Sequence, residues 1–283
     1  MTNRKLDMGK AWTQTTALIG SNRDTISAIA GLFFFLPSFA SALLVPELAN
    51  PPQPSGPAGA DPAVAMRALA DQMTALYADN WPLLVGLSIV QFVGSMSLFA
   101  LLTDRGRPTV GEALGMGLRS IPTYIAAQLL TALGAGISIG LPIGLAAALA
   151  PPVVAVLVLL AGVVVLVYVF MKFALIAPVI AIEGERNPVS AITRSWQLTK
   201  GNSFRILLFL FLLIFTIGII MALVTGTLGL ILSAFGEPVA TIGTDVVGGL
   251  VNALFTVIIL VVTVAIHRQL AGASPEALAS EFE

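Results

Sequence analysis

The residues of this sequence that could do chemistry are few and widely spaced. Four acidic or imidazole side chains could act on a lipid headgroup at a membrane surface: Asp104, Glu183, Glu185 and His267. A hydrolytic site needs an acid, a base and an activated nucleophile within hydrogen-bond reach of one another. These four residues are scattered along the chain, so a membrane enzyme remains a hypothesis that depends on the fold bringing them together.

The sequence contains no recognisable metal, cofactor or catalytic motif. His267 is the sole histidine and there is no cysteine. Thiolate ligands, disulfides and cysteine nucleophiles are therefore excluded, and one histidine without clustered carboxylates makes a poor zinc site. There is no nucleophile elbow and no nucleotide-binding motif either. We expect no catalytic, cofactor-binding or metal-binding residues, and a protein that is not an enzyme.

Basic side chains offer the clearest binding chemistry. The candidates for contact with anionic lipid are Lys172, Arg194, Lys200 and Arg205. A lysine or arginine close to an anionic membrane surface contributes about 1 kcal/mol to binding. Lys172 follows 20 uncharged residues, and we expect its long side chain to reach the headgroups from the end of an apolar helix.

Small and polar residues interrupt the apolar stretches. Gly136, Gly140 and Gly144 recur every four residues, which places them on one helix face and predicts close helix packing there. Four polar residues lie within apolar stretches: Gln91, Ser95, Gln128 and Asn252. They would hydrogen-bond between helices or line a common cavity, and the sequence does not choose between these two roles.

The composition is that of a membrane protein. Apolar residues make up 57% of the chain and charged residues 10%, against about 45–50% and about 25% in soluble domains. So much apolar surface cannot be hidden from water with so few charges. The net charge of −1 excludes a nucleic-acid binder that relies on overall positive charge.

Five charge-free stretches are long enough to cross a bilayer, which takes roughly 20 apolar residues. The stretch 120–171 holds two crossings, and Pro151–Pro152 is the natural turn between them. A break at 140–142 with a re-entrant segment is the alternative. The predicted spans are 25–46, 81–103, 121–150, 152–182, 206–234 and 246–266. We therefore predict an all-α polytopic membrane bundle of six helices forming one integral membrane domain, residues 1–283.

The basic residues predict the orientation. With a cytoplasmic amino terminus, 13 of the 14 basic residues fall on the inner side and Arg67 alone on the outer side. This positive-inside bias places both termini in the cytoplasm, with a tail at 267–283, in a bacterial inner membrane. The first span also resembles a signal peptide with a Ser38-Phe39-Ala40 site, but its long leading segment favours retention.

The segments between the spans carry a few regular elements. The outer loop, 47–80, begins with a proline-rich stretch and continues as a short helix over 62–77. Amphipathic segments Leu6–Ser21, Thr109–Arg119 and Pro188–Lys200 precede spans one, three and five, and we expect them to lie at the cytoplasmic interface. They indicate three repeated hairpins, unless shared membrane-protein composition accounts for the similarity.

A family resemblance rests on the region between spans four and five. It comprises Ala177-Pro178-Val179-Ile180-Ala181-Ile182-Glu183, Asn187-Pro188-Val189-Ser190-Ala191-Ile192 and Arg194-Ser195-Trp196-Gln197-Leu198-Thr199-Lys200-Gly201-Asn202. This pattern resembles bacterial six-span proteins related to the membrane domain of glycerophosphoryl diester phosphodiesterases. In fused members the phosphodiesterase is a separate soluble barrel, and no part of this sequence is polar enough for it. The resemblance therefore implies the membrane part without diesterase activity.

These observations lead to one preferred function and one alternative. The preferred reading is a non-enzymatic membrane protein that organises the membrane, interacts with lipids or docks a cytoplasmic or membrane protein partner. The alternative is a transporter or channel for an apolar or amphipathic solute or for lipid, which requires a cavity lined by Gln91, Gln128 or Asn252. Nucleic acid is not an expected partner, and the sequence leaves the oligomeric state open.

Overall fold

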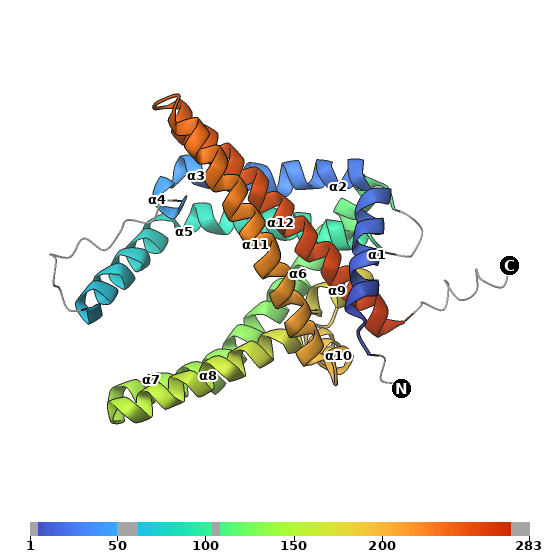
Figure 1. Ribbon diagram of the computed structural model, residues 1–283. Coiled ribbons are helices and arrows are strands. Elements are labelled where there is room, and N and C mark those ends of the chain that lie inside the picture. The colour runs from blue at the N-terminus through green and yellow to red at the C-terminus, as the bar shows by residue number, and fades with distance from the viewer. Residues whose placement is uncertain (1–4, 50–61, 104–107, 273–283) are drawn as a thin grey trace. The chain divides into compact units, whose positions relative to one another are not determined.

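The computed structural model describes residues 5–49, 62–103 and 108–272, and every regular element in them is a helix (Figure 1). In chain order the elements are α1 (Met8–Ser21), α2 (Arg23–Ala30), η1 (Gly31–Phe35), α3 (Leu36–Leu44), α4 (Pro46–Ala49), α5 (Pro62–Leu101), α6 (Val110–Ala135), η2 (Gly136–Gly140), α7 (Leu141–Leu149), α8 (Pro152–Phe173), α9 (Ile176–Ile182), α10 (Pro188–Thr199), α11 (Ser203–Ser233) and α12 (Val239–Ala271). Six helical runs in these residues are long and apolar enough to cross a membrane: Arg23–Leu44, Arg67–Leu101, Val110–Leu149, Pro152–Ile182, Ser203–Ser233 and Val239–Ala271. The all-α membrane architecture with six spans is therefore confirmed.

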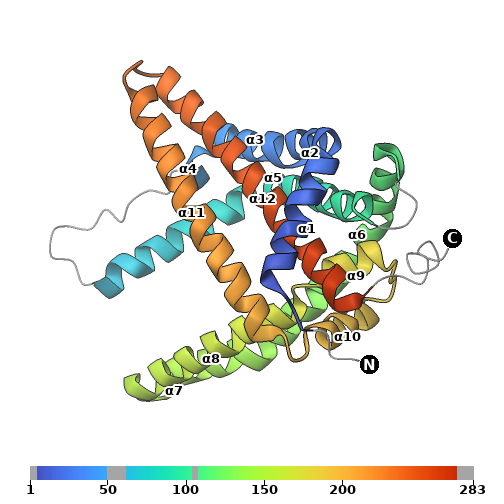
Figure 2. The same cartoon turned by 45° about the vertical axis from the view of Figure 1, so that its right-hand side comes forward.

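The turn between the third and fourth spans lies at Ala150 and Pro151, between α7 and α8. Pro151 has extended backbone angles (φ −57°, ψ 149°), as expected for a residue that precedes another proline. The alternative break at 140–142 does not occur, because η2 and α7 continue the helical run begun by α6. Figures 1 and 2 both show α8 running back along this run.

Two spans contain a π-helical turn, η1 and η2, and each has a proline six residues after its first glycine, at Pro37 and Pro142. A proline inside a helix has no N–H and collides with the carbonyl four residues earlier. In both turns the residue before the proline donates its N–H to the glycine carbonyl five residues back. The wider turn accommodates the proline without ending the helix.

The second span is longer than predicted. The separate short helix expected in the outer loop is instead the beginning of α5, which runs without a break from Pro62 to Leu101 and includes Pro82. The stretch 62–80 is rich in alanine, the residue that most favours helix, so the helix extends far beyond the apolar residues of the span. The proline-rich part of the loop lies outside the described residues.

Two of the three predicted interfacial segments are helices of their own, α1 and α10. The third, Thr109–Arg119, is instead the first part of α6. Thr109 caps this helix by accepting a hydrogen bond from the Glu112 N–H, while the Glu112 carboxylate accepts one from the Thr109 N–H. Nothing after this capping box stops the helix, and it continues through Pro122 into the span.

The chain divides into two compact units. Unit 1 comprises Met1–Ile26, Ser95–Thr216 and Ile258–Glu283, and unit 2 comprises Ser27–Gly94 and Ile217–Val257. Each is described by itself below.

In unit 1, close helix contacts depend on glycines other than those predicted. A Cβ atom on Gly117 of α6 would lie 2.8 Å from the Ser97 backbone nitrogen of α5, and one on Gly162 of α8 would lie 2.6 Å from Ile143. A Cβ on Gly136, Gly140 or Gly144 would meet no atom within 4 Å. The predicted packing stripe therefore makes no close contact within the described chain, because these glycines face away from α8 while Ile139 and Ile143 face it.

In unit 2, aromatic side chains of η1 fill the space beside two glycines. Phe33 packs on Gly94 of α5, and the Phe35 ring would lie 3.1 Å from a Cβ on Gly249 of α12. Phe34 is 1% exposed. A side-chain hydrogen bond of 2.6 Å from Asn252 Nδ2 to Ser38 Oγ joins α12 to α3.

Candidate functional site

Unit 1 contains a charged cluster formed by Glu183, Arg194 and His267. Arg194 donates to the Glu183 carboxylate from Nε at 2.9 Å and from Nη2 at 3.2 Å. His267 Nε2 lies 2.9 Å from Glu183 Oε1, and an ionised carboxylate only accepts, so the imidazole donates. One carboxylate thus joins the end of α9, the middle of α10 and the end of α12.

The charged cluster keeps the Glu183 carboxylate ionised. Burial acts to raise the pKa of Glu183, but the hydrogen bonds and positive charges of His267 and Arg194 outweigh it and lower that pKa from its ordinary 4.5 to about 2. The His267 side chain is 4% exposed and that of Glu183 27%. Electrostatic attraction is stronger in such partly buried surroundings than in water.

Local sequence explains how Glu183 reaches this position. Pro178 cannot donate to the carbonyl of Ala174, and α8 gives way to α9 at Ala174 and Leu175, just where that bond is missing. After Glu183, Gly184 takes a left-handed φ of +75° and turns the chain. Asn187 then caps α10 by accepting from the Val189 and Ser190 N–H groups.

The fold brings together two of the four residues considered for headgroup chemistry, Glu183 and His267. Glu185 instead accepts from the Asn187 N–H and the Ser190 hydroxyl, which lowers its pKa. Asp104 lies outside the described residues. Within those residues no three His, Asp or Glu side chains are grouped so that they could hold a metal ion.

Lys172 is buried in the protein rather than extended towards headgroups. It is 3% exposed, and its Nζ lies 5.4 Å from the centre of the Tyr168 ring and 5.2 Å from that of Trp196. Its carbonyl accepts a 2.8 Å hydrogen bond from Ser195 of α10. The sequence prediction missed this arrangement because α10 folds back onto the end of α8 and covers the lysine with Trp196, where cation–π attraction favours the ammonium.

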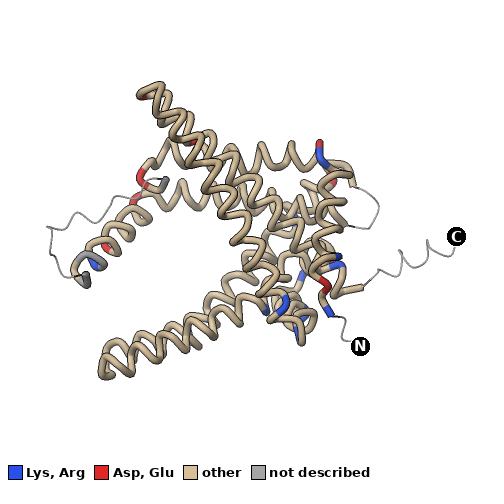
Figure 3. The backbone as a smooth tube through the Cα atoms, viewed as in Figure 1, with Lys and Arg blue, Asp and Glu red and all other residues tan. Residues whose placement is uncertain are grey.

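The remaining basic candidates lie near the junction of α10 and α11. Arg205 donates to the Leu6 carbonyl at 3.2 Å, and Asn202 Oδ1 accepts from the Leu6 N–H at 2.9 Å. This pair of bonds docks the segment before α1. Lys200 is exposed and follows the last turn of α10, and Figure 3 shows basic residues gathered around this helix.

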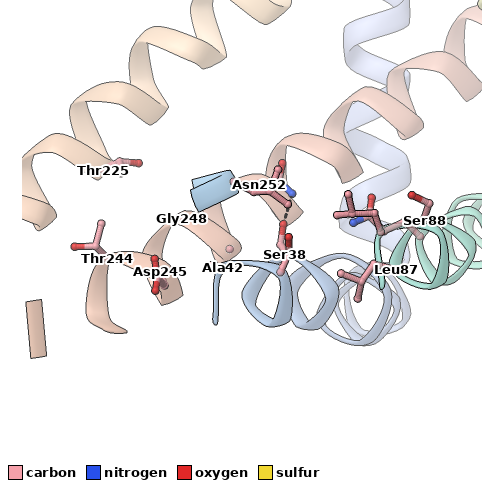
Figure 4. A pocket seen from close by; sticks show the side chains of 14 residues that line it. Ser38, Ala42, Leu87, Ser88, Thr225, Thr244, Asp245, Gly248 and Asn252 are labelled. Atoms are coloured by element: carbon pink, nitrogen blue, oxygen red, sulfur yellow. Dashed lines mark hydrogen bonds between the residues drawn. The ribbon is translucent and has the colours of Figure 1, made fainter. Parts of the chain in front are cut away.

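Unit 2 contains a cavity of about 660 Å³ with both polar and apolar lining residues, which we call the unit 2 cavity (Figure 4). Its lining comes from α3, α4, α5, α11 and α12. Its lining residues are Ser38, Ser41, Ala42, Leu48, Leu84, Leu87, Ser88, Gln91, Thr225, Thr244, Asp245, Gly248, Gly249 and Asn252. Hydroxyl and amide groups therefore face the same space as three leucines and two glycines, a mixture typical of sites for small amphipathic molecules.

Two of the four polar residues singled out from the sequence, Gln91 and Asn252, line the unit 2 cavity. The other two belong to unit 1, where Gln128 donates to the Tyr124 hydroxyl within α6. The serines and threonines of the lining were not predicted. Such residues occur throughout membrane helices, and their sequence carries no signal that they share one cavity.

Asp245 lies inside a span in the structure, in contrast to its position outside the predicted spans. The predicted spans left it outside the membrane, just before the span at 246–266. In the structure α12 begins at Val239, so Asp245 lies inside the helix and lines the unit 2 cavity. An ionisable residue in this setting is costly and points to a functional site.

One family model matches the region from the middle of α7 to the end of α12. Residues 145–271 match the family model described as membrane domain of glycerophosphoryl diester phosphodiesterase. This region resembles that membrane domain. No curated protein sequence and no solved structure matches the chain.

The membrane-domain match covers the whole of the charged cluster and only one side of the unit 2 cavity. Glu183, Arg194 and His267 lie within residues 145–271, as do Asp245 and Asn252. The cavity residues of α3 and α5 precede the matched region. The similarity to the membrane domain thus includes α8–α10, which carry the charged cluster, while the cavity also depends on the first half of the chain.

Proposed function

We propose that this multi-pass membrane protein binds a lipid or another amphipathic molecule in the unit 2 cavity and does not chemically convert it. The observation that carries the proposal is the cavity itself, in which hydroxyls and amides lie beside Leu48, Leu84 and Leu87. A polar head would hydrogen-bond to the former while a hydrocarbon chain lies against the latter. Hydrogen bonding of this kind orients a ligand in a largely apolar site.

Gly248 provides a direct test, because a Cβ there would meet no atom within 4 Å. We expect Gly248→Leu to fill the cavity without disturbing the helices and to lower the amount of co-purifying lipid at least fivefold, measured by native mass spectrometry. Gly226→Leu is the matched control, since a Cβ on Gly226 would also meet no atom within 4 Å and Gly226 also belongs to unit 2, but it does not line the cavity. Equal lipid occupancy in the two variants would contradict the proposal. Non-enzymatic binding further requires that bound lipid keeps its mass during incubation.

Transport is the second candidate, favoured by the position of Gln91 and Asn252 on two different helices that line one cavity. It requires the cavity to open alternately to the two sides of the membrane. Vesicles reconstituted with the chain should then move a labelled lipid between leaflets faster than empty vesicles. If the labelled lipid moves no faster than in empty vesicles, the chain does not transport it, and the binding proposal alone stands.

We further propose that the protein lies in a bacterial inner membrane with both termini in the cytoplasm, where anionic headgroups contact Lys200 and Arg205. Lys200 is exposed at the end of α10, and a basic residue there is favoured near an anionic surface. Replacing Lys200 with glutamine should reduce anionic lipid binding severalfold, measured with vesicles of increasing phosphatidylglycerol content. An unchanged dependence on phosphatidylglycerol would argue against this contact.

A further inference from the structure

Asp245 gives the unit 2 cavity a negative charge. It is the only ionisable side chain among the residues that line the cavity, and it lies three residues before Gly248 on α12 (Figure 4). Among the residues that the structure describes, the Asp245 carboxylate has no ion-pair partner.

The rest of unit 2 does not supply that charge. Its described residues include five carboxylates and one basic residue, Arg67. Arg67 lies on α5, 17 residues before Leu84, the first residue of that helix to line the cavity. At 1.5 Å per residue this separates them by about 25 Å along the helix axis, well beyond the reach of an ion pair. Within the described part of unit 2, Asp245 therefore has no basic side chain within reach.

We propose that the unit 2 cavity selects an amphipathic molecule with a positively charged amine head, such as an alkylamine or an aminolipid. This inference rests on the proposed binding function and names the class of ligand. The ammonium group lies against the Asp245 carboxylate, and its remaining hydrogens are donated to hydroxyl or amide oxygens of the lining. The hydrocarbon chain lies along Leu84 and Leu87.

The leucines argue for an amphipathic amine over an inorganic cation. A bare metal ion is held by several oxygen ligands converging on one point, and apolar side chains add nothing to such a site. An anionic head would meet the Asp245 carboxylate and be repelled. A neutral head could use the hydroxyls and amides but would leave the carboxylate unpaired in a span, which is unfavourable.

The test compares three probes with one chain length: spin-labelled stearylamine, stearic acid and methyl stearate. The full chain is reconstituted in phosphatidylcholine vesicles, and electron paramagnetic resonance measures the fraction of each probe immobilised by the protein. We expect the amine to associate roughly tenfold more strongly than the ester, the size of one partly shielded ion pair. Asp245→Asn should remove this preference and leave the ester unchanged.

Asp79→Asn is the matched control, since Asp79 is an exposed carboxylate of α5 that does not line the cavity. The amine preference should survive this substitution. If it survives Asp245→Asn as well, or if Asp245→Asn weakens all three probes equally, the inference is overturned.

Cavity-filling variants separate failure of this inference from failure of the proposed function. Two separate variants, Ser88→Leu and Gly248→Leu, are measured, so that a folding defect in one of them does not decide the result. If both lower ester binding but the wild type shows no amine preference, the ligand class is wrong and the binding function stands. If neither variant changes any probe, both the binding function and the inference fall.

Discussion

At the scale of single residues, Glu183 holds together parts of the chain that are far apart in sequence. Its two partners, Arg194 and His267, are 11 and 84 residues away. From the sequence, we predicted that Glu183, Arg194 and His267 lie near a membrane surface, without a contact between them. Arg194 was predicted to contact lipid, whereas in the structure both of its bonds to Glu183 are internal.

Removing the negative charge of Glu183 should destabilise the protein. In Glu183→Gln the amide keeps the size of the side chain but lacks the charge that attracts Arg194 and His267. Hydrogen bonds to charged groups contribute about 1.5–3 kcal/mol, so we expect a loss of about 2 kcal/mol, measured by thermal unfolding in detergent. Asp71→Asn, at an exposed carboxylate of α5, is the control and should unfold like the wild type.

The same carboxylate predicts a pH dependence. Because folding lowers the pKa of Glu183 from 4.5 to about 2, its contribution to stability is complete above about pH 4.5. It is lost as the pH falls towards 2, where the folded state also becomes protonated. The unfolding temperature of the wild type should therefore fall more steeply than that of Glu183→Gln between pH 5 and pH 3. Parallel curves would show that Glu183 does not carry this dependence.

At the scale of elements, prolines and glycines decide where helices bend, break and cross. Pro151 lies in the turn between the third and fourth spans, and Pro178 follows the break between α8 and α9 in the fourth span. At both places the proline nitrogen has no hydrogen to donate to a helical hydrogen bond. Pro82 and Pro122, by contrast, lie inside continuous helices. A proline in an apolar sequence thus indicated a local distortion but did not by itself say whether the helix would end.

The crossing of α5 and α6 predicts different effects for two nearby glycines. A methyl group on Gly117 would collide with the Ser97 backbone, whereas one on Gly115 would meet no atom within 4 Å. Gly117→Ala should therefore destabilise the protein by about 1–3 kcal/mol. Gly115→Ala should be neutral or stabilise it by up to about 1 kcal/mol, since alanine favours helix. Chemical denaturation in mixed micelles would measure both, and equal effects would contradict the observed crossing.

At the scale of the whole molecule, charge is divided between the two units. Among the described residues, unit 1 carries ten lysines and arginines and unit 2 carries only Arg67. The positive-inside rule applies to loops that flank spans, and the basic residues of unit 1 lie in or next to segments that the proposed orientation places in the cytoplasm. The division also leaves Arg67 as the single basic residue among the described residues of unit 2.

The absence of cysteine from the sequence makes this orientation easy to test. A single cysteine in place of Glu237, in the turn between α11 and α12, should react with a membrane-impermeant maleimide added to intact cells. A single cysteine in place of Lys200 should react only after the membrane is opened. The opposite pattern would show that the protein is inserted the other way round.

The sequence by itself determined that the protein has six membrane-spanning helices, because apolar stretches of sufficient length require no knowledge of their neighbours. It also indicated the turn at Pro151 and the helix that begins at Pro188, which depend on residues adjacent in the chain. Only the tertiary structure decided that Lys172 is covered by Trp196, that Gly117 rather than Gly140 makes a close crossing, and that Gln91, Asp245 and Asn252 share one cavity. The physical reason is that apolar length and backbone hydrogen bonding are local properties, whereas the face that a helix presents to another depends on packing between distant segments.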